Sequence, residues 1–155
     1  MIRPLDDLME YPAFAGFEVK EFGWDGCVNN AVLQSEPDHW FVGEMLNQLE
    51  HEFDGSEEAH YSSPHLTTAV LKKHGLKSYG RTNVKGVEVF PVEYFYPFGW
   101  HERFRITKIT TETRTIHWYG RSWLKKTESK EKIRSKIIER LNIVLWELCM
   151  RHLKN

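Results

Sequence analysis

Apolar side chains recur along this chain in short runs that alternate between strand-like and helix-like spacing. A short helix is predicted at 4–9 and strands at 13–18 and 31–33, the latter following a loop at Asn29-Asn30. A helix is predicted from about Pro37 to Phe53, where apolar residues recur at steps of three and four: Phe41, Met45, Leu46, Leu49 and Phe53. The first third of the chain therefore mixes both kinds of element.

The rest of the chain continues this mixture. A second helix is predicted to start at Ser63-Pro64, because serine is a good N-cap and proline is accepted at the first helical position, and to end at Gly75. Strands are predicted at 87–90, 92–96 and 113–118, and a long closing helix at 129–152. Strands interspersed with helices indicate an α/β fold with a mixed sheet and flanking helices.

Length and composition narrow the class of protein. A chain of 155 residues suits one domain with a sizeable core. Phe, Trp and Tyr make up 14% of the residues, and such side chains both fill cores and stack on sugars and bases. The net charge of −1 argues against nucleic acid as a partner. Two cysteines, Cys27 and Cys149, are too few for a disulfide scaffold, and either a single disulfide or two free thiols remains open.

Charge is unevenly distributed. Residues 1–120 hold 11 Lys/Arg and 18 Asp/Glu, a net of −7, whereas residues 121–155 hold 10 and four, a net of +6. The basic residues beyond 125 accompany an apolar helical stripe, which either packs on the domain or lies on an anionic membrane through 125–145. We divide the chain into a domain at 1–124 and a basic amphipathic helix at 125–155.

Neither a membrane-spanning run nor a signal peptide is predicted, since no 18-residue apolar stretch occurs and the start lacks a basic region followed by an apolar one. We therefore expect a cytoplasmic protein, with the inner face of the membrane as a peripheral docking surface if the basic helix binds it.

Three polar segments carry candidate chemistry. Asn29 and Asn30 could bind a hydroxyl-rich ligand or simply form a turn. Residues 62–65, Ser-Ser-Pro-His, could bind an anionic or hydroxylated ligand at a helix start or merely cap the helix. The segment 117–123, His-Trp-Tyr-Gly-Arg-Ser-Trp, combines an imidazole, a cation, a hydroxyl and three aromatics, or packs as a strand end. No glycine-rich phosphate loop occurs.

Taken in order, four stretches resemble the second half of glycosyltransferase family 32, which includes the yeast initiating mannosyltransferase type and bacterial capsule and lipopolysaccharide transferases and is related to clostridial glucosylating toxins. The stretches are Arg3-Pro4-Leu5-Asp6-Asp7-Leu8 through Ala15-Gly16-Phe17-Glu18; Asn29-Asn30-Ala31-Val32-Leu33 with Pro37-Asp38-His39; Ser63-Pro64-His65-Leu66-Thr67; and Ile116-His117 with Ser122-Trp123. They resemble, respectively, the segment after the family's Asp-x-Asp motif, its Asn-rich loop, its Gly-Pro-x-x-Leu-Thr helix start and its terminal His-His-Trp-x-x-Ser-Trp motif. The resemblance covers about residues 3–124.

The resemblance implies a GT-A fold and retaining transfer of a sugar from a nucleotide diphosphate sugar to a glycan or lipid-linked acceptor, with Mn²⁺ or another divalent cation. It implies that His117 faces the metal and that Ser122 and Trp123 close over the nucleotide. It also implies that Asn29 and Asn30 face the sugars, with His65 and Thr67 on the acceptor side. A hard cation would neutralise the diphosphate leaving group.

The sequence also departs from the family pattern. No Asp-x-Asp occurs in it, Ser63 replaces a glycine, and Trp118 stands where a second histidine is common. Two hypotheses follow. In one, the chain is the acceptor-side half of a sugar transferase that is inactive without an N-terminal half carrying Asp-x-Asp; in the other, it is a non-catalytic module that binds a glycan or a partner through its aromatics.

Overall fold

The computed structural model of the chain describes residues 1–18, 27–52, 59–99 and 102–118. All of them belong to one unit, Met1–Gly120. The second unit, Arg121–Asn155, lies outside the described residues, and so do the predicted helix at 129–152 and the predicted membrane-binding stretch at 125–145.

Four strands form one mixed sheet in the order β2-β1-β4-β3. The strands are β1 (Ala13–Phe17), β2 (Val28–Ser35), β3 (Thr82–Val84) and β4 (Val87–Phe90). Strand β1 pairs antiparallel with β2 and parallel with β4, and β4 pairs antiparallel with β3. The predicted α/β class, with a mixed sheet and flanking helices, is confirmed.

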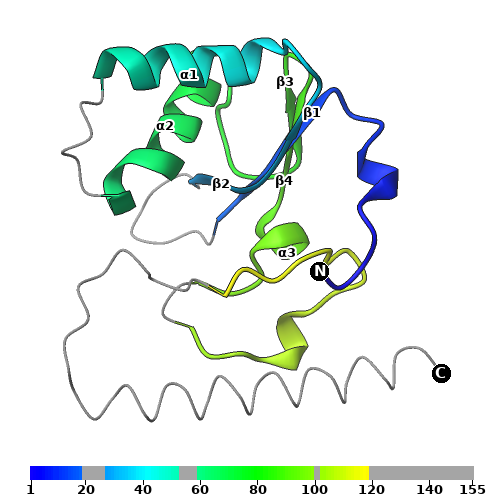
Figure 1. Ribbon diagram of the computed structural model, residues 1–155. Coiled ribbons are helices and arrows are strands. Elements are labelled where there is room, and N and C mark those ends of the chain that lie inside the picture. The colour runs from blue at the N-terminus through cyan, green and yellow to red at the C-terminus, as the bar shows by residue number, and fades with distance from the viewer. Residues whose placement is uncertain (19–26, 53–58, 100–101, 119–155) are drawn as a thin grey trace, which may run out of the picture. The chain divides into compact units, whose positions relative to one another are not determined.

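Both faces of the central strand β1 are covered, and for this reason every one of its residues is buried. Alternate side chains point to opposite faces of a strand. Ala13, Ala15 and Phe17 pack against α1 (Trp40–Glu52) and α2 (Ala59–Lys73), which lie side by side on one side of the sheet in Figure 1. On the other face, Phe14 packs with Phe90 and with Phe95 of the short helix α3 (Val92–Phe95).

The two long helices differ from the prediction mainly at their starts. Helix α1 begins at Trp40, because Asp38 has a φ of +59° that a right-handed helix cannot contain. The second helix, α2, begins at Ala59, so Ser63 and Pro64 lie inside it rather than at its cap. Its end is as predicted. Gly75 has a φ of +117°, and the amides of Gly75 and Leu76 donate to Lys72 and Leu71 in the bond pattern of a Schellman motif.

Two predicted strands are wrong. Residues 92–95 form α3, because Pro91 ends β4 and the Val92 amide donates to the Tyr79 hydroxyl instead of to a neighbouring strand. Residues 113–118 are extended but pair with no strand among the described residues. They cross α3, where the amides of Arg114 and Thr115 both donate to the Tyr94 carbonyl.

Three short elements complete the description. The predicted helix at 4–9 is a single 3-10 turn, η1 (Asp6–Leu8), and a second such turn is η2 (Ile106–Lys108). The sequence prediction missed β3, which forms a two-residue hairpin with β4. Lys85 and Gly86 in this turn have φ values of +49° and +94°, as tight hairpins of this length require. No described helix combines the length and the apolar character needed to cross a membrane.

Candidate functional site

Polar side chains from five separate segments meet where β1 ends and β2 begins. They are Glu18, directly after β1; Asn29 and Asn30 in β2; Ser63 in α2; Tyr96, directly after α3; and His117 in the extended segment. Hydrogen bonds, a ring contact and an electrostatic interaction connect them. We call these six residues the polar cluster.

An irregularity in β2 creates the cluster. Phe14 of β1 pairs with Gln34 and Gly16 with Asn29, so the β2 segment between these two partners is longer than the β1 segment it faces. The extra residues leave regular pairing, and the Asn29 side-chain oxygen accepts from the Ala31 amide at 2.8 Å. The prediction of a loop at Asn29-Asn30 is therefore wrong, because both residues lie in β2. The asparagines do lie where the regular pairing of β2 with β1 is interrupted.

The two asparagines have different surroundings. Asn29 is buried, and its side-chain amide donates to Glu18 Oε2 at 3.0 Å. Asn30 is exposed, and its side-chain oxygen accepts from the Ser63 hydroxyl at 2.6 Å. Asn29 therefore fixes the geometry of the cluster, whereas Asn30 presents its amide N–H groups to solvent, where a ligand can reach them.

Tyr96 connects the cluster to the core. Its side chain is fully buried, its hydroxyl accepts from the Val32 amide at 2.8 Å, and it donates to the Asn29 carbonyl over a longer 3.4 Å. Burial raises the pKa of this phenol, and the nearby Glu18 carboxylate raises it further. Tyr96 is therefore a neutral hydroxyl that braces the irregular part of β2.

His117 lies against the edge of Tyr96, with ring centroids 5.8 Å apart and planes at 73°. Partial burial lowers the pKa of its imidazole, and the Glu18 charge opposes that shift without cancelling it. At neutral pH the imidazole is consequently uncharged, so one ring nitrogen carries a lone pair that can accept a proton or bind a metal ion.

The remaining predicted site residues lie further along α2 than Ser63 or outside the described residues. Thr67 is fully buried, and its hydroxyl donates to the Ser63 carbonyl one turn earlier in α2. His65 is half-buried on the same helix. Their acceptor-side role stays a prediction, and so does the nucleotide-side role of Ser122 and Trp123, which lie outside the described residues.

The described residues do not by themselves make a metal site. No group of three or more His, Cys, Asp or Glu side chains comes together in the part of the chain that the structure covers. Glu18 and His117 are two suitable donors near one another, whereas a protein-bound divalent cation usually takes more than two protein or substrate ligands. A cation at this cluster would need further ligands from elsewhere.

Sequence reasoning missed Glu18 and Tyr96 as site residues. Glu18 directly follows a buried strand, a position where functional side chains commonly gather, so this signal was available. Tyr96 carried no such signal, because it was predicted to lie in a strand that does not exist. Cys27 beside the cluster is a free thiol; burial raises its pKa, and it contacts the Thr68 hydroxyl at 3.4 Å.

Comparison with known proteins yields one family. A family model described as the alpha 1,4-glycosyltransferase conserved region matches residues 34–153, about three quarters of the chain. Neither the curated proteins nor the solved structures gave a match.

Proposed function

Because the chain belongs to the family of the alpha 1,4-glycosyltransferase conserved region, we propose that it transfers a sugar from a nucleotide diphosphate sugar to a glycan or lipid-linked acceptor with retention of configuration. The family match over residues 34–153 is the observation that carries this proposal. The resemblance to glycosyltransferase family 32, to its GT-A fold and to the related toxins supports the finer points of donor type and stereochemistry.

The polar cluster supports the proposal because its groups suit a sugar. Exposed amide groups at Asn30 can donate to sugar hydroxyls, and the Glu18 carboxylate can accept from them. In the transfer, the acceptor oxygen bonds to C1 of the donor sugar, the bond from C1 to the phosphate oxygen breaks, and the acceptor hydroxyl loses its proton. A neutral His117 is suited to hold that proton.

A divalent cation, manganese by resemblance, belongs to the proposal as the group that would neutralise the leaving diphosphate. The described residues offer it the Glu18 carboxylate, and they offer the His117 lone pair only while that imidazole holds no proton from the acceptor. The sequence contains no Asp-x-Asp, so we propose that this chain provides the acceptor side and that further ligands come from an Asp-x-Asp-bearing half. Contact of residues 125–145 with a membrane that carries lipid-linked acceptors also stays a proposal.

The test is a transfer assay with the full 155-residue chain, UDP- and GDP-sugars, oligosaccharide acceptors and Mn²⁺, alone and with a separately expressed domain carrying Asp-x-Asp. We expect sugar transfer that EDTA abolishes. NMR of the product should show that the anomeric configuration of the donor sugar is retained. If no combination gives sugar transfer or metal-dependent nucleotide binding, the hypothesis of an enzyme is rejected. The hypothesis of a module that binds a glycan or a partner then remains.

Matched variants test the assigned residues. Asn30→Ala should raise the KM for a sugar substrate, and His117→Ala should lower kcat, because one binds hydroxyls and the other handles a proton. The controls are Asn47→Ala and His51→Ala, which remove the same kinds of side chain from exposed positions on α1. Equal activity in the site variants and their controls would show that the polar cluster is not the site.

A further inference from the structure

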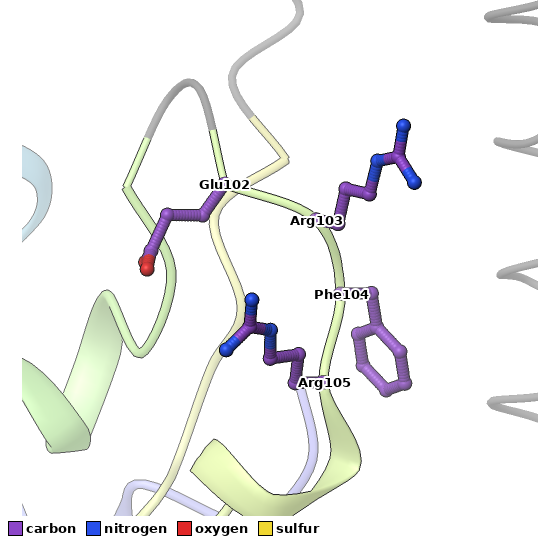
Figure 2. Close-up of a pocket in the computed structure, with 4 residues that line it drawn as sticks. All are labelled: Glu102, Arg103, Phe104 and Arg105. Carbon is purple, nitrogen blue, oxygen red and sulfur yellow. The ribbon is translucent and has the colours of Figure 1, made fainter.

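A second candidate site lies at residues 102–105, the segment that leads into η2. A cavity of about 490 Å³ is lined there by Glu102, Arg103, Phe104 and Arg105 (Figure 2). Figure 2 shows Arg103 and Phe104 pointing to one side of the segment, and Glu102 and Arg105 to the other. The segment therefore places a guanidinium and an aromatic ring together on one side.

Some charged side chains on and near this segment form ion pairs, and two arginines form none among the described residues. Glu102 forms an ion pair with Lys108 at 2.5 Å, and Arg114 forms one with Asp7 at 2.6 Å. Arg103 and Arg105, in contrast, are exposed and form no ion pair within the part of the chain that the structure describes. Two guanidinium groups thus remain available to an anion, and guanidinium binds carboxylates and phosphates in a bidentate manner.

An aromatic surface adjoins Arg103. The Phe104 ring stacks on Trp118 with ring centroids 6.0 Å apart and planes at 26°, and it also packs on the buried Phe98 with centroids 5.2 Å apart. Trp118 is supported by this stack, yet 47% of it is exposed to solvent. A large aromatic face that is held in place and left open is a favourable surface for a sugar ring or a base.

We propose that Arg103 and the Phe104–Trp118 stack bind an acceptor saccharide that carries an anionic group, either a carboxylate or a phosphate. The inference rests on the proposed sugar transfer and names the substrate class of its acceptor. The guanidinium pairs with the anionic group while the sugar ring lies on Trp118.

The test measures binding by the full chain in the absence of any donor, by saturation-transfer NMR and calorimetry. The probes are cellobiose, cellobiouronic acid, which differs by one carboxylate, and cellobiose bearing a phosphate monoester. We expect both acidic probes to bind about tenfold more tightly than cellobiose, with the preference lost at high salt, since such pairs are screened. The two acidic arms show whether carboxylate or phosphate is the better anion.

Variants separate this site from general attraction to a basic surface. Arg103→Gln should remove the preference for acidic probes, and Trp118→Ala should weaken the binding of all three. Arg105→Gln removes the same charge from the same segment on its other side and should have the smaller effect, while Ile106→Ala is the control for an exposed apolar residue.

Two results would overturn the inference: acidic and neutral probes that bind equally, or Arg103→Gln and Arg105→Gln variants with the same loss. Binding of UDP or GDP that depends on both Arg103 and Trp118 would also overturn it in favour of a donor site. Sugar transfer to neutral acceptors, with no preference for acidic ones, would refute this inference and leave the proposed function intact.

Discussion

Replacing Tyr96 by Phe tests whether one buried hydroxyl holds the candidate site together. The substitution keeps the ring, which packs with Phe95 and His117, and removes only the hydroxyl. That hydroxyl accepts from the Val32 amide and donates to the Asn29 carbonyl, and both partners lie in the irregular part of β2. We expect a less stable protein and a looser polar cluster.

The size of the effect follows from the two bonds. The bond from Val32 at 2.8 Å has ordinary geometry, whereas the one to Asn29 at 3.4 Å is at the limit of the range and contributes little. Loss of one good bond with its amide left without a partner costs about 1–2 kcal/mol. For a chain of this size that corresponds to a fall in Tm of roughly 3–6 °C.

Urea unfolding of both proteins at one pH measures the change. The matched control is Tyr79→Phe, because the Tyr79 hydroxyl also accepts from a backbone amide, that of Val92 at 3.1 Å, but away from the cluster. Both variants should lose stability, and only Tyr96→Phe should also raise the KM for a sugar substrate. A loss below about 0.5 kcal/mol for Tyr96→Phe would refute the bracing role.

Three further predictions concern packing, backbone and pH. Gly16→Ala should lower the free energy of unfolding in urea by about 1–3 kcal/mol, because its new Cβ would lie 2.4 Å from a ring carbon of the buried Phe95. An unchanged urea midpoint would show that the core rearranges to accept the methyl group. Gly75→Ala should destabilise the protein by about 1 kcal/mol because the φ of Gly75 is +117°, whereas Gly43→Ala, within α1, should stabilise it by about 0.5–1 kcal/mol. Both positions have room for a methyl group, so changes of the same sign in the two variants would contradict the argument from backbone conformation. Burial lowers the pKa of His117 in the folded protein from 6.5, so its contribution to stability is complete above about pH 6.5 and is lost as pH falls toward the folded pKa. His117→Gln should therefore flatten the pH dependence of the free energy of unfolding between pH 7 and 5, and an unchanged pH dependence would contradict this reasoning.

Spacing and turn chemistry were sufficient for elements that depend on local contacts. The sequence predicted three such features: the apolar spacing of α1, the buried run of β1 and the glycine that ends α2. Each depends only on which side of one element faces the core or on which residue accepts a positive φ. Prediction failed at 92–96 and 113–118, where a strand-like composition did not lead to strand pairing. A strand needs a neighbour to bond with, and Pro91 turned the chain away from the sheet.

The candidate site shows the same division. Asn29, Asn30 and His117 were predicted from residue type, and the structure brings these three into one cluster while it keeps Thr67 in the core. Glu18 and Tyr96 joined the site only through contacts between residues far apart in the chain. The surroundings of each residue, and with them every pKa shift at the site, follow from those contacts.

By itself, the sequence determined the α/β class, the main helices and the kinds of chemistry that the chain can offer, because periodicity and residue type are local properties. Only the tertiary structure decided which polar groups meet. The longer β2 segment opposite β1 displaces the asparagines toward Tyr96, and the crossing of α3 by residues 114–117 places His117 on the same phenol. Bonds between segments as distant as Val32 and Tyr96 have no signature in local pattern, since their geometry exists only once the sheet has formed.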